Sequence, residues 1–194
     1  AGTVTSGLQS QEFQLLVLEN DQFYALSGRT DSAGVFRVVS FSEGKGTSAN
    51  GIFSVPDARS FSNDGSVTNG SINATFVPKT NIINGSAPAA AVLAYDTPAA
   101  LSTVVGTWAA TSLYGDSVNF SISAAGILSA SFAGCTYSGL VAPRASGKGV
   151  LDVSVTVGPA PCASAGERFV GIGVTSVLAN GKRELIIAGT SAAR

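Results

Sequence analysis

The chain has 194 residues, of which 45% are apolar and only 12% are charged, and its formal net charge is −1. With 11 basic and 12 acidic residues and no basic cluster, it lacks the charged surface that nucleic acid requires, and no apolar run is long enough to span a membrane. The 23 glycines and the many serines and threonines are typical of a secreted β-protein, because small hydroxyl residues suit the exposed face of a pleated sheet.

Alternation of apolar and polar residues runs through most of the chain. It predicts half-buried strands, because successive side chains of a strand point to opposite faces. Residues 97–101 are expected to connect two halves, and Pro98 favours one helical turn over residues 99–104. Before this connector we expect strands at residues 13–18, 22–28, 35–41, 51–55, 71–77 and 90–95.

The same pattern continues after the connector, where Asn180-Gly181 between two apolar runs predicts a β-hairpin. Residues 13–28 faintly resemble residues 169–189, which suggests two related modules; the alternative is that all alternating strands look alike. We predict an all-β fold with very little helix, made of two tandem antiparallel meander modules, 1–97 and 98–194, each a small barrel or barrel-like sandwich. The second module is expected to contain strands at 106–111, 117–123, 127–132, 136–141, 150–157, 169–177 and 184–190.

Cys135 and Cys162 are the two cysteines of the chain, and each lies beside turn-forming residues. Two predicted strands between them can bring their positions together. A disulfide is therefore the favoured interpretation, and two buried free thiols are the alternative. A loop of this length would stabilise the fold by roughly 3 to 4 kcal/mol, and a disulfide would imply an oxidising compartment.

The start of the chain also predicts export. The sequence contains no methionine, so Ala1 is not an initiator residue, and the small residues that follow it fit the site left by a removed signal peptide. A lipid-bearing cysteine just upstream of Ala1 fits this start equally well.

Residues that would carry catalysis are scarce. The absence of histidine removes the Ser-His-Asp and Cys-His arrangements, and with two cysteines it argues against a zinc site. Ser146 and Lys148 have the spacing of a Ser-Lys pair, but their glycine-rich turn is typical of a solvated hairpin tip. Glu12, Asp152 and Glu184 fall on the polar faces of strands. We predict no catalytic residue, no cofactor, no metal site and no enzymatic activity.

Aromatic residues of the second half give the candidate binding surface. Trp108, Tyr114 and Tyr137 would form it, and packing in the core is the alternative for Trp108. The sequence also leaves open glycosylation at four sequons, which begin at Asn69, Asn73, Asn84 and Asn119.

Several motifs of the second half carry a family resemblance: Gly106-Thr-Trp108, the turn at residues 134–139, Pro161-Cys162 and the segment 180–189. Through them, residues 101–194 resemble a group of small envelope lipoproteins from Gram-negative bacteria. The resemblance implies a disulfide-containing, β-barrel-like C-terminal module. It assigns no activity to named residues, because the shared positions are turn and core positions that bear on the fold. The lipid-bearing cysteine of that group has no counterpart in this sequence.

These observations favour a non-enzymatic protein of the bacterial cell envelope, cell surface or extracellular space that acts by binding. Its expected partner is a protein, a second copy of itself, or a small apolar ligand held as in a lipocalin. The alternative function is a self-assembling subunit of an extracellular fibre or surface layer, which would use residues 1–10 for strand addition. An unrecognised hydrolase is a further alternative.

Overall fold

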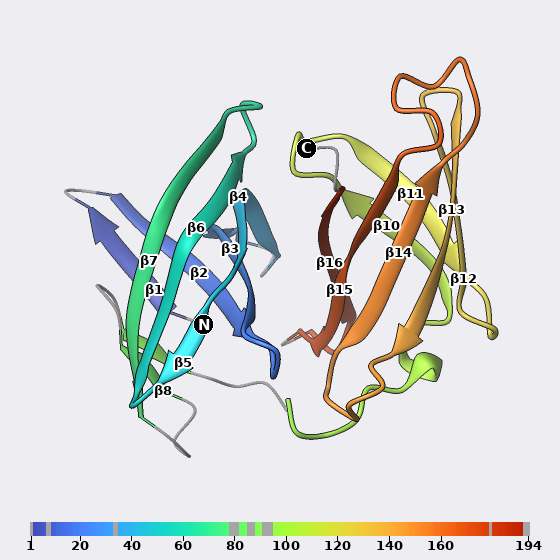
Figure 1. The fold of residues 1–194 in the computed structure, drawn as a ribbon. Helices are drawn as coiled ribbons and strands as arrows, with labels where there is room; N and C mark the ends of the chain where they lie inside the picture. The colour runs from blue at the N-terminus through green and yellow to red at the C-terminus, as the bar shows by residue number, and fades with distance from the viewer. Residues whose placement is uncertain are drawn as a thin grey trace. The chain divides into compact units, whose positions relative to one another are not determined.

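The computed structural model of the chain describes residues 2–6, 9–32, 35–77, 82–84, 88–90, 95–178 and 180–191. It confirms the predicted fold class, since it is 64% strand and 2% helical and its two sheets are antiparallel, one of them a half-barrel. The chain divides into two compact units (Figure 1): Ala1–Val92 with Leu113–Gly115, and Leu93–Ser112 with Asp116–Arg194. The division into an N-terminal module 1–97 and a C-terminal module 98–194 stays a prediction.

The first unit carries a sheet of nine strands in the order β4-β3-β2-β1-β9-β8-β7-β6-β5. Every pairing between neighbours is antiparallel. The strands are β1 (Gly2–Ser6), β2 (Gln9–Val17), β3 (Gln22–Thr30), β4 (Phe36–Lys45), β5 (Thr47–Ala49), β6 (Ile52–Ser62), β7 (Val67–Val77), β8 (Ile82–Asn84) and β9 (Pro88–Ala90).

The first sheet closes on itself. Strand β4 pairs with β3 on one side and with β6 on the other, from Ser40↔Ser62 to Glu43↔Arg59. Eight of the nine strands, all except β5, therefore follow one another around a closed circuit of antiparallel pairs. A closed circuit leaves no long unpaired edge in these strands to attract another chain.

A recurring turn joins strands in both units. In it the residue before the turn donates its N–H to the carbonyl four residues on, as Leu18 does to Gln22, Ser123 to Ile127 and Leu178 to Lys182. The last turn residue has positive φ: it is Gly126 or Gly181 in the second unit and Gly65 in the turn after Ser62 of the first, whereas the turn after Leu18 has Asp21, at φ 62. This is a three-residue hairpin turn, so Asn180-Gly181 forms the predicted hairpin with one more loop residue than the two-residue type.

Both faces of the first sheet are apolar around β3. Phe23 packs with Phe53, Val55 and Ala58 in a cluster in which every member is at most 3% exposed. The next residue, Tyr24, points to the opposite face, where its ring stacks on Phe41 and the Phe41 ring stacks on Phe61. Tyr24, Phe41 and Phe61 therefore form a second buried group of rings, on the face opposite Phe23.

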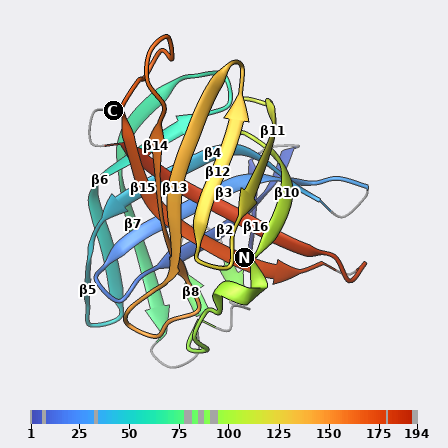
Figure 2. The same ribbon diagram turned by 90° about the vertical axis from the view of Figure 1, so that its right-hand side faces the viewer.

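The second unit carries a sheet of seven strands that follow one another in chain order, β10 to β16 (Figure 2). A 3-10 turn, η1 (Leu101–Thr103), precedes it, as the helical turn predicted over residues 99–104 suggested. The strands are β10 (Gly106–Thr111), β11 (Ser117–Ile122), β12 (Ile127–Phe132), β13 (Cys135–Pro143), β14 (Leu151–Val157), β15 (Arg168–Val177) and β16 (Arg183–Ser191).

The core of the second unit lies on one face of this sheet, next to η1. Val104 follows η1 and is fully buried against side chains from β11 to β14. Trp108, Phe120 and Leu185 pack against this core while staying partly exposed. The buried members are Val104, Ile122, Leu128, Val141, Leu151 and Val153.

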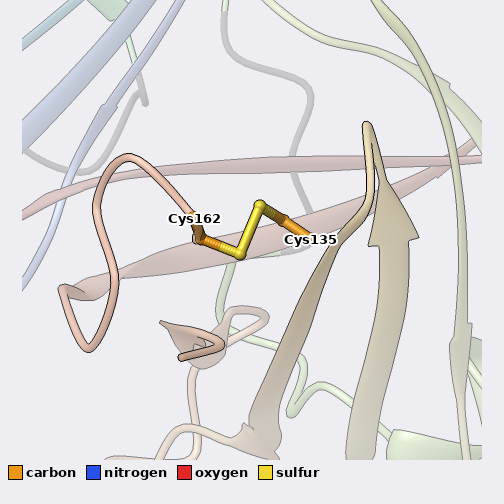
Figure 3. Close-up of a disulfide and its surroundings, with 2 residues drawn as sticks. All are labelled: Cys135 and Cys162. Atoms are coloured by element: carbon orange, nitrogen blue, oxygen red, sulfur yellow. A yellow bond between two sulfur atoms is a disulfide. The ribbon is translucent and has the colours of Figure 1, made fainter. Parts of the chain in front are cut away.

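The predicted disulfide between Cys135 and Cys162 is present (Figure 3). Cys135 begins β13 directly after the tight turn from β12, where it pairs with Phe132. Cys162 lies in the loop between β14 and β15, and its sulfur reaches back to β13. The bond therefore ties that loop to the β12–β13 hairpin, 27 residues away in sequence.

The strands of the second unit match the predicted ranges closely, whereas those of the first unit differ in several places. β1, β5, β8 and β9 have no predicted counterpart, and β6 and β7 are longer than the strands expected at 51–55 and 71–77. The strand expected at 90–95 falls mostly outside the described residues. The unpredicted strands are short or poor in large apolar residues, so alternation alone does not mark them.

Candidate binding surface

Four residues of the second sheet form one row across four strands. Trp108 of β10 pairs with Phe120 of β11, Phe120 with Ala130 of β12, and Ala130 with Tyr137 of β13. Directly paired residues of a sheet share a face, so Trp108 and Tyr137 lie on the same face as the core. The structure thus places two of the three predicted surface residues in one row.

Other aromatic side chains lie on this same face. Phe132 pairs with Cys135, and Phe169 pairs with Val155, which packs against the core. We call the five aromatic residues of this face the inner surface, and each of them is only partly buried: Trp108, Phe120, Phe132, Tyr137 and Phe169. The sequence singled out Trp108 and Tyr137 but not the three phenylalanines, although the alternation in β11 and β12 carried that signal.

Tyr114 stands apart from the inner surface. It lies in the turn between β10 and β11, and it is 58% exposed. Its place in a turn, outside the paired strands, separates it from the row that contains Trp108 and Tyr137. The predicted three-residue aromatic surface is therefore not one surface.

The face that carries the inner surface has a dry part and an open part. Near η1, the side chains of Val104, Ile122 and Leu151 are at most 2% exposed. Away from η1, the five aromatic side chains keep part of their area in contact with solvent. Large apolar side chains left partly open on a sheet face mark a binding site more often than scattered exposed ones do.

The opposite face of the same sheet carries both hydroxyl and apolar residues. A single row across five strands presents only hydroxyl residues, and all of them are exposed; these are Thr107, Ser121, Ser129, Ser138 and Thr156. A neighbouring row on this outer face contains Ile127, Leu140 and Val170, which are 54%, 51% and 52% exposed. Both faces therefore have apolar area in contact with solvent, and the aromatic side chains distinguish the inner surface.

The gap between β10 and β16, which we call the seam, borders the inner surface. β10 pairs with β11 alone and β16 pairs with β15 alone. Side chains bridge the gap: a guanidinium N–H of Arg183 donates to the Thr103 carbonyl at 2.5 Å, and the guanidinium carbon lies 5.9 Å from the Trp108 ring centre. The Trp108 indole N–H in turn donates to the Val104 carbonyl at 2.8 Å.

The residues weighed for catalysis have structural partners. The Lys148 ammonium lies 2.7 Å from an Asp96 carboxylate oxygen and 5.3 Å from the Tyr95 ring centre. Asp152 accepts from Arg144 at 2.6 Å, and Glu184 accepts from Ser176 at 3.0 Å. These contacts give each of the three candidates a role in holding local structure.

The pKa values of two carboxyl groups are lowered. The Thr30 hydroxyl and N–H donate to Glu12 and hold the pKa of that carboxyl below 4.5. The Ser66 hydroxyl and N–H donate to the exposed Asp64 and hold the pKa of its carboxyl below 3.8. A carboxylic acid that donates a proton near neutral pH needs a raised pKa. Neither group fits that role.

The sequons have different surroundings. Asn69, Asn73 and Asn119 lie on strands with exposed side chains, and Asn73 accepts a hydrogen bond from the Ser54 hydroxyl at 2.6 Å. The side chain of Asn84 lies outside the part of the chain whose side chains are described.

Two further findings concern the part of the chain that the structure describes. In that part of the chain no three or more histidine, cysteine or acidic residues gather where they would hold a metal ion. The same part contains no helix that is long and apolar enough to cross a membrane. Comparison with protein-family models, with curated proteins and with solved structures finds no match for this chain.

Proposed function

We propose that this protein is a non-enzymatic, exported protein that binds a partner through the inner surface of its second sheet. The observation that carries the proposal is the partly exposed row of aromatic side chains from Trp108 to Tyr137, on the face that also holds the core. Aromatic residues dominate binding energetics because each removes a large apolar area from water on association.

Export is supported by the disulfide. A bond between Cys135 and Cys162 persists in an oxidising compartment and is rare in the reducing cytosol. The low charge, the hydroxyl-rich outer face and the resemblance to small envelope lipoproteins favour the cell envelope, cell surface or extracellular space of a bacterium. Trapping the thiols of intact cells with a mass-tagged alkylating reagent tests this: both cysteines should be protected until a reductant is added.

A benzophenone photo-crosslinker at the position of Tyr137 tests the binding function in cells that make the protein. Irradiation should give one discrete adduct, because Tyr137 lies on the inner surface. The matched control is the same crosslinker at Ser129, which lies on the outer face of the neighbouring strand and should give no adduct. Equal labelling from both positions, or none from Tyr137, would show that the inner surface is not the binding site.

The second candidate function is a self-assembling structural subunit. The observation that favours it is the pair of unpaired strand edges, β10 and β16, in the second sheet. The stretch predicted for strand addition, residues 1–10, includes β1, which pairs with β2 and β9, and the start of β2, which pairs with β1. Donating this stretch would require it to leave its own sheet. Filaments formed by the purified protein would favour this function over partner binding.

A further inference from the structure

The two edges of the seam run in the same direction. Six successive antiparallel pairings connect β10 to β16 through the seven strands, so the first and last strands are parallel to each other. An odd-numbered meander cannot close by the antiparallel pairing that it uses everywhere else. One further strand, antiparallel to both edges, would bring the number to eight, as in the closed circuit of the first sheet.

Inner-facing side chains of β10 and β16 are exposed next to the seam. Ile187 of β16 pairs with Gly173, and Gly173 pairs with Leu151, which is 1% exposed on the core face. Ile187 shares that face and yet is 38% exposed. On the other edge, Ala110 pairs with the inner-facing Val118 and is also exposed. These residues are open because no strand lies beside them on the side of the seam.

The β10 edge also lacks the features that keep edges from pairing. Its sequence, Gly106–Thr111, contains no charged residue and no proline, and its register with β11 runs without a bulge. Natural edge strands are normally protected by charges, prolines or bulges. An edge without them suits the addition of a strand.

Charge gives the added strand a direction and a composition. Lys182 and Arg183, both exposed, lie where β16 begins, while Glu167 lies beside its end, where it accepts a hydrogen bond from Ser191. A strand antiparallel to β10 and β16 would place its C-terminal end next to the two basic residues. A carboxylate at that C-terminal end would lie next to Lys182 and Arg183, which carry the opposite charge. A basic residue at the N-terminal end would lie near Glu167.

We propose that the seam binds an extended segment of a partner polypeptide as an eighth strand. The segment lies antiparallel to β10 and β16, carries apolar residues at alternate positions that cover Ile187 and Ala110, and ends in carboxylates next to Arg183. The inference rests on the proposed function, because it names the class of partner for the same inner surface. Side chains bridge the seam in the unbound protein, so Arg183 exchanges its contact with the Thr103 carbonyl for the incoming carboxylate.

Synthetic peptides test this on the full-length protein with its disulfide intact. The probe is an eight-residue peptide that alternates valine with serine or threonine and ends in two aspartates with a free carboxylate. Trp108, the one tryptophan of the chain, reports binding by fluorescence, and hydrogen exchange reports pairing. The expected result is saturable binding with slowed exchange of amides in both β10 and β16. The control peptide has the same sequence except for prolines at two central positions, which cannot donate backbone hydrogen bonds, and it should not bind.

Charge reversal tests the assigned direction. Arg183→Glu should weaken the aspartate-ended peptide by roughly tenfold and favour a lysine-ended one, because like charges in contact oppose binding. Arg183→Lys should keep the original preference. Arg168→Glu is the matched control, since Arg168 is an exposed arginine on the outer face at the start of β15, and it should leave both affinities unchanged.

Three results would overturn the inference: no protection of either edge, protection of one edge only, or protection of β10 that rises with protein concentration without peptide. The last would assign the edge to a second copy of the chain. A crosslink from Tyr137 in cells, together with no protection by peptides, would leave the binding function standing and remove the eighth strand. Protection of both edges without any adduct from Tyr137 would support the eighth strand and contradict partner binding through the inner surface in cells.

Discussion

Both sheets of this protein are built from antiparallel hairpins, but only the first sheet closes by backbone pairing. In the first sheet, backbone pairing from Ser40↔Ser62 to Glu43↔Arg59 joins β4 to β6 and closes an even circuit of strands. In the second sheet, the Arg183 side chain bridges the seam between β10 and β16, and the described residues show no backbone pairing there. The number of strands, rather than the kind of residue, decides which meander can close.

This difference leaves the two sheets with different edges. A closed circuit pairs its own backbone groups, so eight strands of the first sheet have no long unpaired edge. An open sheet with an apolar inner face keeps unsatisfied pairing capacity next to exposed apolar area, which is what a binding site needs. The disulfide belongs to the unit with the open sheet, where it ties the loop between β14 and β15 to the start of β13.

The largest effect is expected from the core of the closed sheet. Phe23→Ala should lower the free energy of unfolding of the first unit by about 3 to 5 kcal/mol, because Phe23 is 1% exposed and its removal leaves a cavity. Hydrogen exchange of β3 in urea measures this, while Trp108 fluorescence follows the second unit. If the units fold independently, the Trp108 transition should not move. The matched control is Ile52→Ala in β6, where the side chain is 52% exposed and the change should be small.

The disulfide tests the open sheet in the same way. Replacing both Cys135 and Cys162 with serine should destabilise the second unit by about 3 to 4 kcal/mol, because the unfolded chain regains the freedom of a loop of 27 residues. The Trp108 unfolding transition in urea measures the loss, and reduced wild-type protein should match the double variant. An equal loss in the first unit would contradict separate stability of the two units.

Two turn glycines form a matched pair within the open sheet. Gly126 and Gly181 have almost the same positive φ, 80 and 78. A Cβ on Gly126 would lie 2.2 Å from the Val141 carbonyl oxygen, whereas a Cβ on Gly181 would meet no described atom within 4 Å beyond its chain neighbours. Gly181→Ala should cost about 1 kcal/mol, from backbone conformation alone. Gly126→Ala should cost about 2 to 3 kcal/mol, because the added methyl group also pushes β13 away.

Urea unfolding followed at Trp108 ranks these two variants. Equal losses would mean that the turn at Gly126 shifts freely and that the contact with Val141 does not hold it. The first unit offers the complementary change, since Asp21 occupies the same turn position at φ 62 while accepting a hydrogen bond from Ser48. Asp21→Gly removes both the unfavourable φ and that hydrogen bond, so its net effect should stay within about 0.5 kcal/mol.

The second sheet was the easier one to predict from sequence. Its strands alternate cleanly because one face meets the core and the other meets water, as the hydroxyl row from Thr107 to Thr156 shows. In the first sheet, Phe23 and Tyr24 are both buried on opposite faces of β3, so alternation of polarity weakens there. The short strands β8 and β9 complete the circuit with three residues each, too few for a period to appear.

The candidate surface was predictable only in part. Trp108 and Tyr137 drew attention because of their residue type, but their shared row depends on the register of three strand pairs, which a single sequence does not fix. The seam was invisible for a related reason, since it depends on the count of paired strands. The Arg183 contact with Thr103 joins residues 80 positions apart, and no local pattern predicts such a contact.

The smallest effect is expected from a carboxylate that links two strands of the closed sheet. Glu12 of β2 accepts hydrogen bonds from the N–H of Thr30, at 3.1 Å, and from its hydroxyl, at 2.5 Å, so its pKa in the folded protein lies below 4.5. Because the folded-state pKa is the lower one, the contribution of Glu12 to stability is complete above the unfolded-state pKa. It is lost as the pH falls through the folded-state pKa.

An NMR titration of the Thr30 amide from pH 7 to pH 2 measures this directly. The amide shift should follow a midpoint below 4.5, and Glu12→Gln should abolish that titration because the amide side chain does not ionise. Trp108 fluorescence in the second unit should stay constant over the pH range in which the Thr30 amide shift changes, since Glu12 links β2 and β3 of the closed circuit. A Thr30 midpoint above 4.5 would mean that these hydrogen bonds do not hold the end of β3 against β2 in solution.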